Sequence, residues 1–164
     1  MSPIAKIFEK LVSIQITGYF ETSLGYSLFS PSQHGFRKNF SCETAIQTIL
    51  DKWKLEIDGK KSILSLFIDF KKAFDLVDQK ILFRKLFHYG FDNKSLNLIN
   101  NYFFERQQIT RIGTAVSEKN DIKCGVPQGS ILWPLLFLIF INDISLLTDL
   151  DMVLFADSMI RICH

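Results

Sequence analysis

The sequence contains few of the residues that build disulfide frameworks and zinc sites. Its 164 residues include three cysteines, Cys42, Cys124 and Cys163, and three histidines. The cysteines are odd in number, lie far apart and are not paired with histidine at a metal-ligand spacing. This pattern argues against a disulfide framework or a zinc site and fits a reducing compartment.

The sequence pattern predicts neither a membrane-spanning run nor a signal peptide. The most apolar stretch, Ile131–Ile141, has 11 residues, well short of the roughly 20 that cross a bilayer. Charged residues are scattered through residues 1–11, unlike a secretory signal peptide. We therefore expect an intracellular protein, of the nucleus or cytoplasm, in which residues 131–141 form a buried helix.

The sequence also has no large excess of positive or negative charge. Nineteen Lys and Arg residues oppose 17 Asp and Glu residues, and the net charge of +2 permits a polyanionic partner without indicating one. Hydrophobic residues make up 48% of the chain, and 16 residues are Phe. This composition predicts one domain with a large core, and apolar surface that another part of a protein covers.

Apolar residues at helical spacing predict that the chain opens with an amphipathic helix. Ile4, Ile7, Phe8 and Leu11 recur at this spacing, and the helix should run to about Gly18.

Capping residues predict where later helices begin. Ser41 should cap a helix that ends near residues 58–59, and Asp78 should cap a helix that stops at Gly90. A further helix is expected over residues 94–104. Residues 107–116 and 121–124 predict two strands joined by the polar turn of residues 117–120.

Two apolar strand patterns carry a carboxylate at their ends. Residues 63–68 have the length and the β-branched and aromatic content of a central strand covered on both faces, and Asp69 follows them. Residues 152–155 and 159–162 predict a hairpin with Asp157 at its tip. If these strands are neighbours in one sheet, the two carboxylates converge.

Converging carboxylates on rigid strands suit a pair of magnesium ions. Mg²⁺ prefers oxygen ligands, and paired ions that serve phosphoryl transfer lie about 3.5–4 Å apart. Each acid could instead pair with a nearby lysine or a backbone donor. Spacing alone leaves both interpretations open.

Four motifs follow one another in a fixed order, and the last three include the features above. They are QHGFR (Gln33–Arg37), LFIDFKKAFDLVD (Leu66–Asp78), GVPQGSILWPLLFLIFINDI (Gly125–Ile144) and FADS (Phe155–Ser158). In this order they resemble the motifs of a reverse transcriptase, most closely the non-LTR retrotransposon type. The resemblance covers nearly the whole chain, because residues 2–11 resemble the end of an earlier motif of the same family.

The resemblance implies roles for both acids and for two residues that follow Asp69. Asp69 and Asp157 would be the catalytic carboxylates that hold two Mg²⁺ ions, with Mn²⁺ as the alternative ion, and the carbonyl of Phe70 would face a metal. Phe74 would crowd the 2′ position of the incoming sugar and so select deoxynucleotides. From its position alone, Phe74 would be an ordinary core phenylalanine.

Residues of two loops would bind nucleotide and nucleic acid, by the same resemblance. Gln128 would line the site for the incoming nucleotide and template. Gln33, Gly35, Arg37 and Gly129 would contact nucleic acid, Arg37 through the fork geometry that suits phosphate. From composition alone, Arg37 would be a solvated loop arginine, Gly129 a turn glycine, and Gly35 a source of unusual backbone geometry.

Two positions depart from the family pattern. Ser158 stands where the family has a second, adjacent aspartate, so the site brings two carboxylates instead of three and compensates two divalent ions less well. Trp133 stands where the family usually has glycine, and its indole should force local repacking where the apolar helix begins.

The resemblance implies an α+β fold that forms part of a right-hand polymerase. Fingers helices would occupy residues 1–60 and the palm residues 61–164, with a small antiparallel sheet backed by helices. We expect the thumb and the rest of a retroelement polyprotein to lie outside this chain. The implied activity is that of an RNA-directed DNA polymerase, which extends a DNA primer on an RNA template with deoxynucleoside triphosphates.

The sequence leaves two other functions open. Ser158 favours an inactive retroelement remnant that at most binds nucleic acid. A small metal-dependent hydrolase could use the same two acids, but it would leave Phe74 and the GVPQGS loop unexplained.

Overall fold

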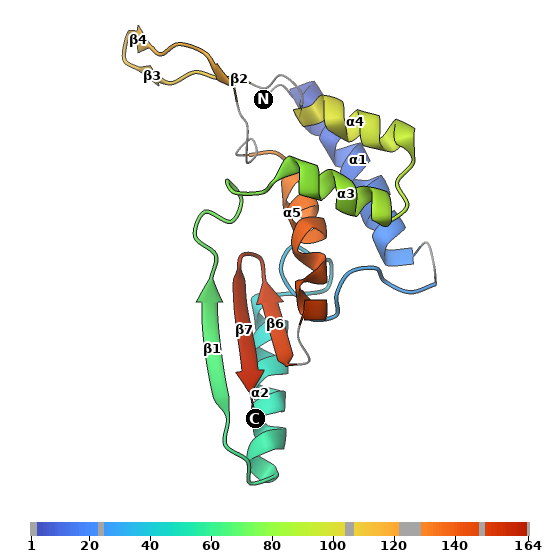
Figure 1. The fold of residues 1–164 in the computed structure, drawn as a ribbon, viewed down its shortest axis with the longest axis vertical. Helices are drawn as coiled ribbons and strands as arrows, with labels where there is room; N and C mark the ends of the chain where they lie inside the picture. The colour runs from blue at the N-terminus through green and yellow to red at the C-terminus, as the bar shows by residue number, and fades with distance from the viewer. Residues whose placement is uncertain (1–2, 23–24, 104–106, 122–128, 148–149, 164) are drawn as a thin grey trace.

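The computed structural model describes residues 3–22, 25–103, 107–121, 129–147 and 150–163. Figure 1 shows a helical layer above a small sheet. The helices are α1 (Pro3–Thr22), α2 (Cys42–Asp58), α3 (Gln79–His88), α4 (Asn93–Phe103), α5 (Trp133–Ile141) and the 3₁₀ helix η1 (Asn142–Leu147). The strands are β1 (Leu64–Asp69), β2 (Gln107–Gln108), β3 (Arg111–Ile112), β4 (Ala115–Val116), β5 (Asn120–Asp121), β6 (Asp151–Phe155) and β7 (Ser158–Cys163).

The sheet that carries both acids has three antiparallel strands in the order β1-β7-β6. Strands β6 and β7 form the predicted hairpin, with Ala156 and Asp157 at its tip. Strand β1 pairs along the other edge of β7, in a register that sets Asp69 opposite Ser158. The hairpin is therefore confirmed, and the two acid-bearing strands are neighbours.

Strand β1 lies at the edge of the sheet, so the prediction of a central strand covered on both faces is wrong. Leu64, Leu66 and Phe67 are 69%, 53% and 65% exposed. Apolar and β-branched residues suit any pleated strand with a packed neighbour. Whether a strand is central depends on which other strands pair with it, and a local pattern does not contain that information.

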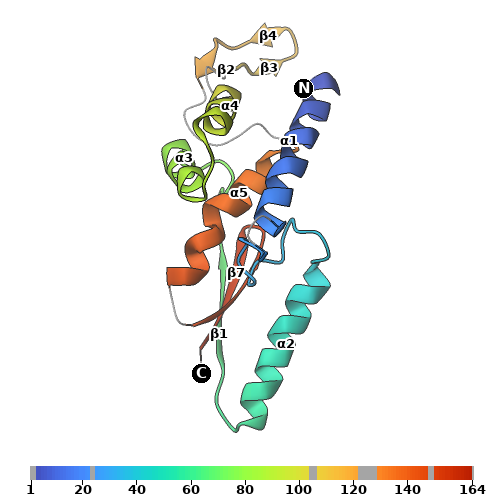
Figure 2. The ribbon, with the colours of Figure 1, turned by 90° about the vertical axis from the view of Figure 1, so that its right-hand side faces the viewer.

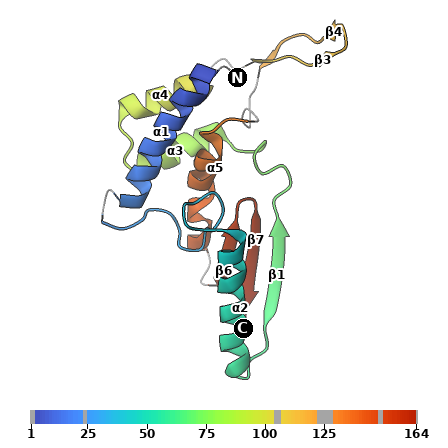
Figure 3. The same cartoon turned by 180° about the vertical axis from the view of Figure 1, so that it is seen from behind.

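Helix α2 covers one face of the sheet, as Figure 3 shows from behind. Its N-cap is Ser41, whose hydroxyl accepts a hydrogen bond from the Thr44 amide at 3.2 Å, and this confirms the predicted cap. Ala45 and Ile49 of α2 pack with buried side chains of β6 and β7. The indole of Trp53 donates a hydrogen bond to Ser65 of β1 at 3.0 Å.

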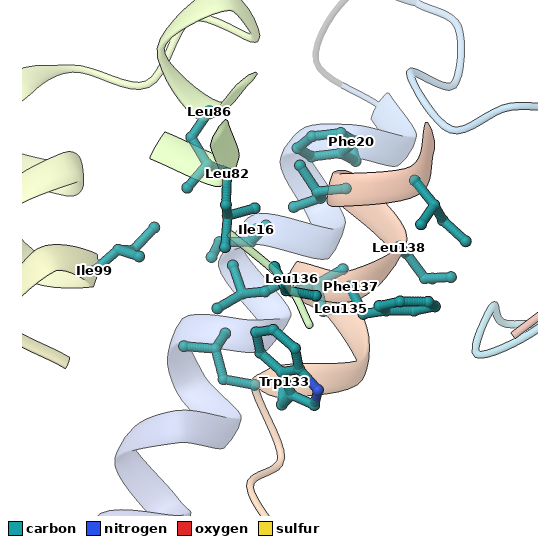
Figure 4. Close-up of a cluster of buried hydrophobic side chains, with 14 of the residues drawn as sticks. Ile16, Phe20, Leu82, Leu86, Ile99, Trp133, Leu135, Leu136, Phe137 and Leu138 are labelled. Carbon is teal, nitrogen blue, oxygen red and sulfur yellow. The ribbon is translucent and has the colours of Figure 1, made fainter. Parts of the chain in front are cut away.

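The second layer consists of α1, α3 and α4 packed around α5 (Figures 2 and 4). Helix α5 is apolar on all sides, and such a helix is stable only when it is enclosed. Leu136, Leu138 and Ile139 are at most 1% exposed, which confirms the predicted buried helix. Burial of each such side chain contributes about 1.5–3 kcal/mol. None of the described helices has the length and apolar character needed to cross a bilayer.

Helix α1 runs beyond the predicted end and buries a different face. The predicted stripe is at least half exposed in the structure: Ile4 80%, Ile7 63%, Phe8 50% and Leu11 56%. The face that packs instead carries Glu9, Ile16 and Phe20. Apolar residues occur on two faces of this helix, and periodicity alone does not decide which face meets the core.

Residues 107–121 form an arm that projects from the helical layer (Figure 1). Strand β2 pairs with β5, and β3 pairs with β4. The chain reverses at Gly113 and Thr114, so the predicted turn at residues 117–120 is wrong. Gly113 has a φ of 61°, and glycine at the first central position is typical of a two-residue hairpin turn. Residues 122–124 of the predicted second strand lie outside the described residues.

The loop before α2 is fixed to the helical layer by Asn142, at the start of η1. The Asn142 side chain accepts a hydrogen bond from the Ser30 amide at 2.7 Å. It donates to the Leu28 carbonyl at 2.7 Å and to the Tyr89 hydroxyl at 2.8 Å. One buried amide therefore joins this loop, the end of α3 and the end of α5.

The same loop is bonded to the acid-bearing hairpin a few residues later. The His34 amide donates to the Leu154 carbonyl, and the Leu154 amide donates to the Ser32 carbonyl, each at 2.8 Å. Gly35 then passes so close to the hairpin that a Cβ atom there would lie 2.2 Å from the backbone nitrogen of Ala156. Gly35 is thus needed for close approach, and the positive φ of this segment falls on Phe36 instead.

Replacing Gly35 by alanine should lower the free energy of unfolding by about 2 kcal/mol or more, because the new methyl group meets hairpin backbone that must move. Gly18→Ala is the matched control: Gly18 lies in α1 with no atom near its absent Cβ. There alanine should raise the unfolding free energy by about 0.5–1 kcal/mol. Urea denaturation measures both, and equal effects of the two substitutions would contradict the close approach.

His34 should make stability depend on pH. Burial, and secondarily the positive charge of Arg37, lowers the pKa of His34 below its ordinary value of 6.5. Its Nδ1 lies 2.9 Å from the Thr44 hydroxyl. The unfolded chain therefore binds this proton more readily than the folded chain, and stability should fall as the pH drops from above 6.5 through the lower folded pKa.

Thermal unfolding measured across roughly pH 5 to 8, the range in which His titrates, tests this dependence. His34→Asn should be less stable than wild type at the upper end but lose less stability on acidification. His88→Asn, at an exposed position of α3, is the control. A pH profile left unchanged by His34→Asn would rule out this source of acid sensitivity.

Candidate active site

Asp69 and Asp157 meet at one end of the three-stranded sheet. Asp69 is the last residue of β1, and the next amide, that of Phe70, donates a hydrogen bond to the Asp157 carbonyl at 3.0 Å. Ser158 stands opposite Asp69, and its hydroxyl donates to Asp69 Oδ1 at 3.2 Å. Backbone pairing therefore holds the backbones of Asp69 and Asp157 side by side.

The oxygen atoms at this end of the sheet fit a hard divalent cation. Asp69 is exposed and Asp157 is half-buried, so both can be reached from solvent. Carboxylate and hydroxyl oxygens are the donors that Mg²⁺ prefers. Within the described residues, no cluster contains three or more Asp, Glu, His or Cys side chains suited to a metal. A bound ion would thus depend on the two acids, with water or a ligand completing its coordination.

The Phe70 carbonyl already accepts one hydrogen bond inside the chain. Its donor is the amide of Ala73, at 3.2 Å, within the tight turn that follows β1. A carbonyl has a second lone pair, so the predicted metal contact of Phe70 stays a prediction.

A cavity of about 340 Å³ opens beside Asp157. Three separate loops contribute to its wall: Phe36 comes from the loop before α2, Phe74 from the turn after β1, and Gly129 from the segment before α5. Two other cavities, of about 350 and 390 Å³, contain neither Asp69 nor Asp157. Of these three cavities in the described part of the chain, the one beside Asp157 is lined by residues of all four predicted motifs.

Phe74 lies both in the hydrophobic core and in the wall of the cavity, the two locations that the sequence left open. Its ring packs on buried Phe137 of α5, with centroids 4.6 Å apart, so it extends the core. It also lines the cavity, where it packs edge-to-face against the ring of Phe36 with the two centroids 6.2 Å apart. A core contact therefore does not exclude a role in the cavity.

Three of the five described non-glycine residues with a positive φ lie at or next to this cavity. Phe36, Lys72 and Ala156 have φ values of 56°, 53° and 55°, a region that residues with a side chain rarely adopt. Phe36 and Lys72 line the cavity, and Ala156 precedes Asp157. Strained residues persist where the surrounding structure holds them, and they cluster at functional sites.

Ser130 and Ile131, which follow Gly129, are held by a buried carboxylate that sequence patterns did not single out. Glu9 of α1 is 3% exposed, and it accepts hydrogen bonds from the Ser130 hydroxyl at 3.0 Å and the Ile131 amide at 2.7 Å. Helical spacing could have indicated its burial, because Glu9 falls on the same face of α1 as buried Ile16. Gln128 lies outside the described residues, so its predicted role stays a prediction.

Arg37 points into the protein. Its side chain is 5% exposed and forms an ion pair with Glu21 at 3.4 Å. It also donates to the Ser30 carbonyl at 3.0 Å and lies 4.4 Å from the centroid of the Phe40 ring. In this conformation Arg37 holds the loop together, and a contact with phosphate, which stays a prediction, would require it to leave these partners.

Gln33 is also turned inward. It is 1% exposed, and its side-chain oxygen accepts a hydrogen bond from the Gly35 amide at 2.7 Å. Gln33 and Gly35 therefore brace the loop against the hairpin, while their predicted contacts with nucleic acid stay predictions.

Trp133 is buried at the start of α5 and forms part of the cavity wall. It is 5% exposed, and its ring meets Phe103 of α4 edge-on at 6.3 Å. Among the described residues, its indole nitrogen has no hydrogen-bond partner. The indole is thus accommodated by aromatic packing between α4 and the cavity.

The chain resembles known proteins over most of its length. A family model described as reverse transcriptase (RNA-dependent DNA polymerase) matches residues 1–164. The probable RNA-directed DNA polymerase from transposon X-element of Drosophila melanogaster is 27% identical over 96% of this chain and 16% of its own length. That from transposon BS of the same species is 27% identical over 88% of the chain and 16% of its own length. This chain thus spans about a sixth of these relatives.

A solved structure shares the fold. Apo telomerase from Candida tropicalis, truncated from its C-terminal domain, superposes with a TM-score of 0.62 at 13% identity, covering 96% of this chain and 34% of that one. This likeness confirms the predicted right-hand polymerase fold, with helices and a small antiparallel sheet. Together with the transposon relatives, the family match over all 164 residues shows that the chain belongs to the reverse transcriptase family, as a domain of the non-LTR retrotransposon type.

Proposed function

We propose that this chain carries the catalytic carboxylates of an RNA-directed DNA polymerase. The reaction would be attack of a primer 3′ hydroxyl on the α-phosphate of a deoxynucleoside triphosphate, directed by an RNA template. The observation that supports it best is the pairing of β1 with β7, because it brings Asp69 and Asp157 to one end of the sheet, where Asp157 lines the cavity.

Asp69 and Asp157 would hold two Mg²⁺ ions between them. Bound ions of this kind activate the attacking hydroxyl and stabilise the departing pyrophosphate. The hydrogen bond from Ser158 would orient the Asp69 carboxylate, but a neutral hydroxyl adds no charge to oppose the ions. The site would therefore bind divalent ions more weakly than one with a third carboxylate.

The cavity would receive the incoming nucleotide. Phe74 in its wall would contact the sugar at the 2′ position, and Gln128 would border the base and template. Lys72, whose exposed side chain reaches the same wall, would supply positive charge for the phosphates.

The right-hand fold suggests a division of the chain. We assign residues 1–60 to the fingers and residues 61–164 to the palm. Because α2 packs on the sheet, part of this fingers segment would brace the palm directly. An RNA template, a DNA primer and deoxynucleotides are the expected partners, and the nucleus or cytoplasm is the expected compartment.

A second candidate is an inactive remnant that at most binds nucleic acid. The observation that favours it is Ser158, since the site has one carboxylate fewer than the family pattern. The two candidates differ in whether the site as it stands can extend a primer.

Primer extension separates them. Residues 1–164 replace the matched segment of the X-element polymerase, and extension of a DNA primer on an RNA template is measured with Mg²⁺ and with Mn²⁺. We expect extension that Asp69→Asn abolishes, and an increase of about tenfold or more with Ser158→Asp, because a third carboxylate improves ion binding.

The controls decide between the candidates. Asp51→Asn, on the exposed surface of α2, should leave extension unchanged. Extension by Ser158→Asp alone would establish the remnant for the natural sequence. Circular dichroism checks that the wild-type and Ser158→Asp proteins are folded. If both are folded and neither extends a primer, the polymerase proposal is wrong for this chain.

A further inference from the structure

Phe36 is a cavity-wall residue to which none of the proposed catalytic steps gives a role. Phe36 is 54% exposed, so an aromatic ring at this position gains little stability from burial. Its φ of 56° lies in the left-handed region that bulky residues avoid. Neither burial nor backbone preference therefore accounts for phenylalanine here.

The surrounding chain forces Phe36 into this conformation. The preceding residues are bonded to β6, and Gly35 is pressed against the hairpin backbone, so the chain has no freedom to approach by another path. Immediately after Phe36, Arg37 is buried and anchored to Ser30 and Glu21. The loop is fixed on both sides, and Phe36 projects its ring toward the turn after β1.

In that position the Phe36 ring meets the ring of Phe74. Their centroids are 6.2 Å apart and their planes cross at 70°, an edge-to-face geometry that is favourable for aromatic pairs. Phe74 also packs on Phe137, which is 2% exposed, with centroids 4.6 Å apart. Phe74 is thus held on its core side by Phe137 and on its solvent side by Phe36.

We propose that Phe36 is a specificity-determining residue of the nucleotide cavity. It fixes the ring of Phe74 from the solvent side and forms the adjoining part of the wall, so that a 2′ hydroxyl on the incoming sugar meets a ring that cannot move aside. Deoxynucleotides are then preferred over ribonucleotides by the pair of rings together. This inference rests on the proposed function, because it assigns the sugar-selecting position to Phe74.

The test compares incorporation of deoxynucleotides and ribonucleotides by the X-element polymerase that carries residues 1–164. Phe36→Ala should lower the ratio of the two kcat/KM values by about tenfold, since a pocket that loses one side chain discriminates less. Phe36→Gly also removes the ring but relieves the positive φ, so it should lower the ratio equally while being more stable. Phe36→Tyr keeps the ring and should keep the ratio.

The matched control is Phe87→Ala, because Phe87 is a 61% exposed phenylalanine of α3 that does not line the cavity. It should leave the ratio at the wild-type value. An unchanged ratio in both Phe36→Ala and Phe36→Gly overturns the inference while leaving the polymerase proposal intact. If Phe36→Tyr lowers the ratio as much as Phe36→Ala does, the inference is also overturned.

Failure of the proposed function is distinguishable from failure of this inference. If the wild-type protein incorporates neither kind of nucleotide, the polymerase proposal fails. Equilibrium dialysis of dATP and ATP against the 164-residue chain with Mg²⁺ then decides the inference. A smaller preference for dATP in Phe36→Ala than in wild type supports it, and the same preference, or none in either protein, overturns it.

Discussion

The antiparallel pairing of β1 with β7 is the constraint on which the candidate site depends. Its register sets Asp69 opposite Ser158 and bonds the Phe70 amide to the Asp157 carbonyl. Side chains alternate between the two faces of a strand, so a slip of one residue would turn Asp69 to the other face of the sheet. The paired strands therefore position the two acids. The cavity beside Asp157 depends in addition on the loop that is bonded to this sheet.

The loop of residues 28–37 makes that attachment. Asn142 fixes one end of it to the helical layer, and the bonds to Leu154 fix the other end to the hairpin. Gly35 allows the close contact that this requires, and the strain appears at Phe36 and Ala156. Motifs that are distant in the sequence therefore meet at one cavity because a single loop is bonded to both layers.

Local patterns predicted much of this fold and less of the site. Caps at Ser41 and Asp78 and the hairpin tip at Asp157 are set by neighbouring residues, and all three were predictable. The exposed edge of β1 and the buried face of α1 depend on partners elsewhere in the chain, so both predictions were wrong. Arg37 and Glu9 show the same limit for charges, since their burial follows from tertiary packing. The positions of Asp69 and Phe74 followed from the motifs, whereas the contact of Phe36 with Phe74 had no sequence signal.

The central claim, that Asp69 and Asp157 form one divalent-ion site, is tested most directly by Mn²⁺ titration followed by NMR. Bound Mn²⁺ broadens nearby amide signals, so those of Phe70 and Ser158 should broaden together and recover when Mg²⁺ is added. Either Asp69→Asn or Asp157→Asn should abolish both effects. Broadening at Phe70 that survives Asp157→Asn, or at Ser158 that survives Asp69→Asn, would contradict a shared site.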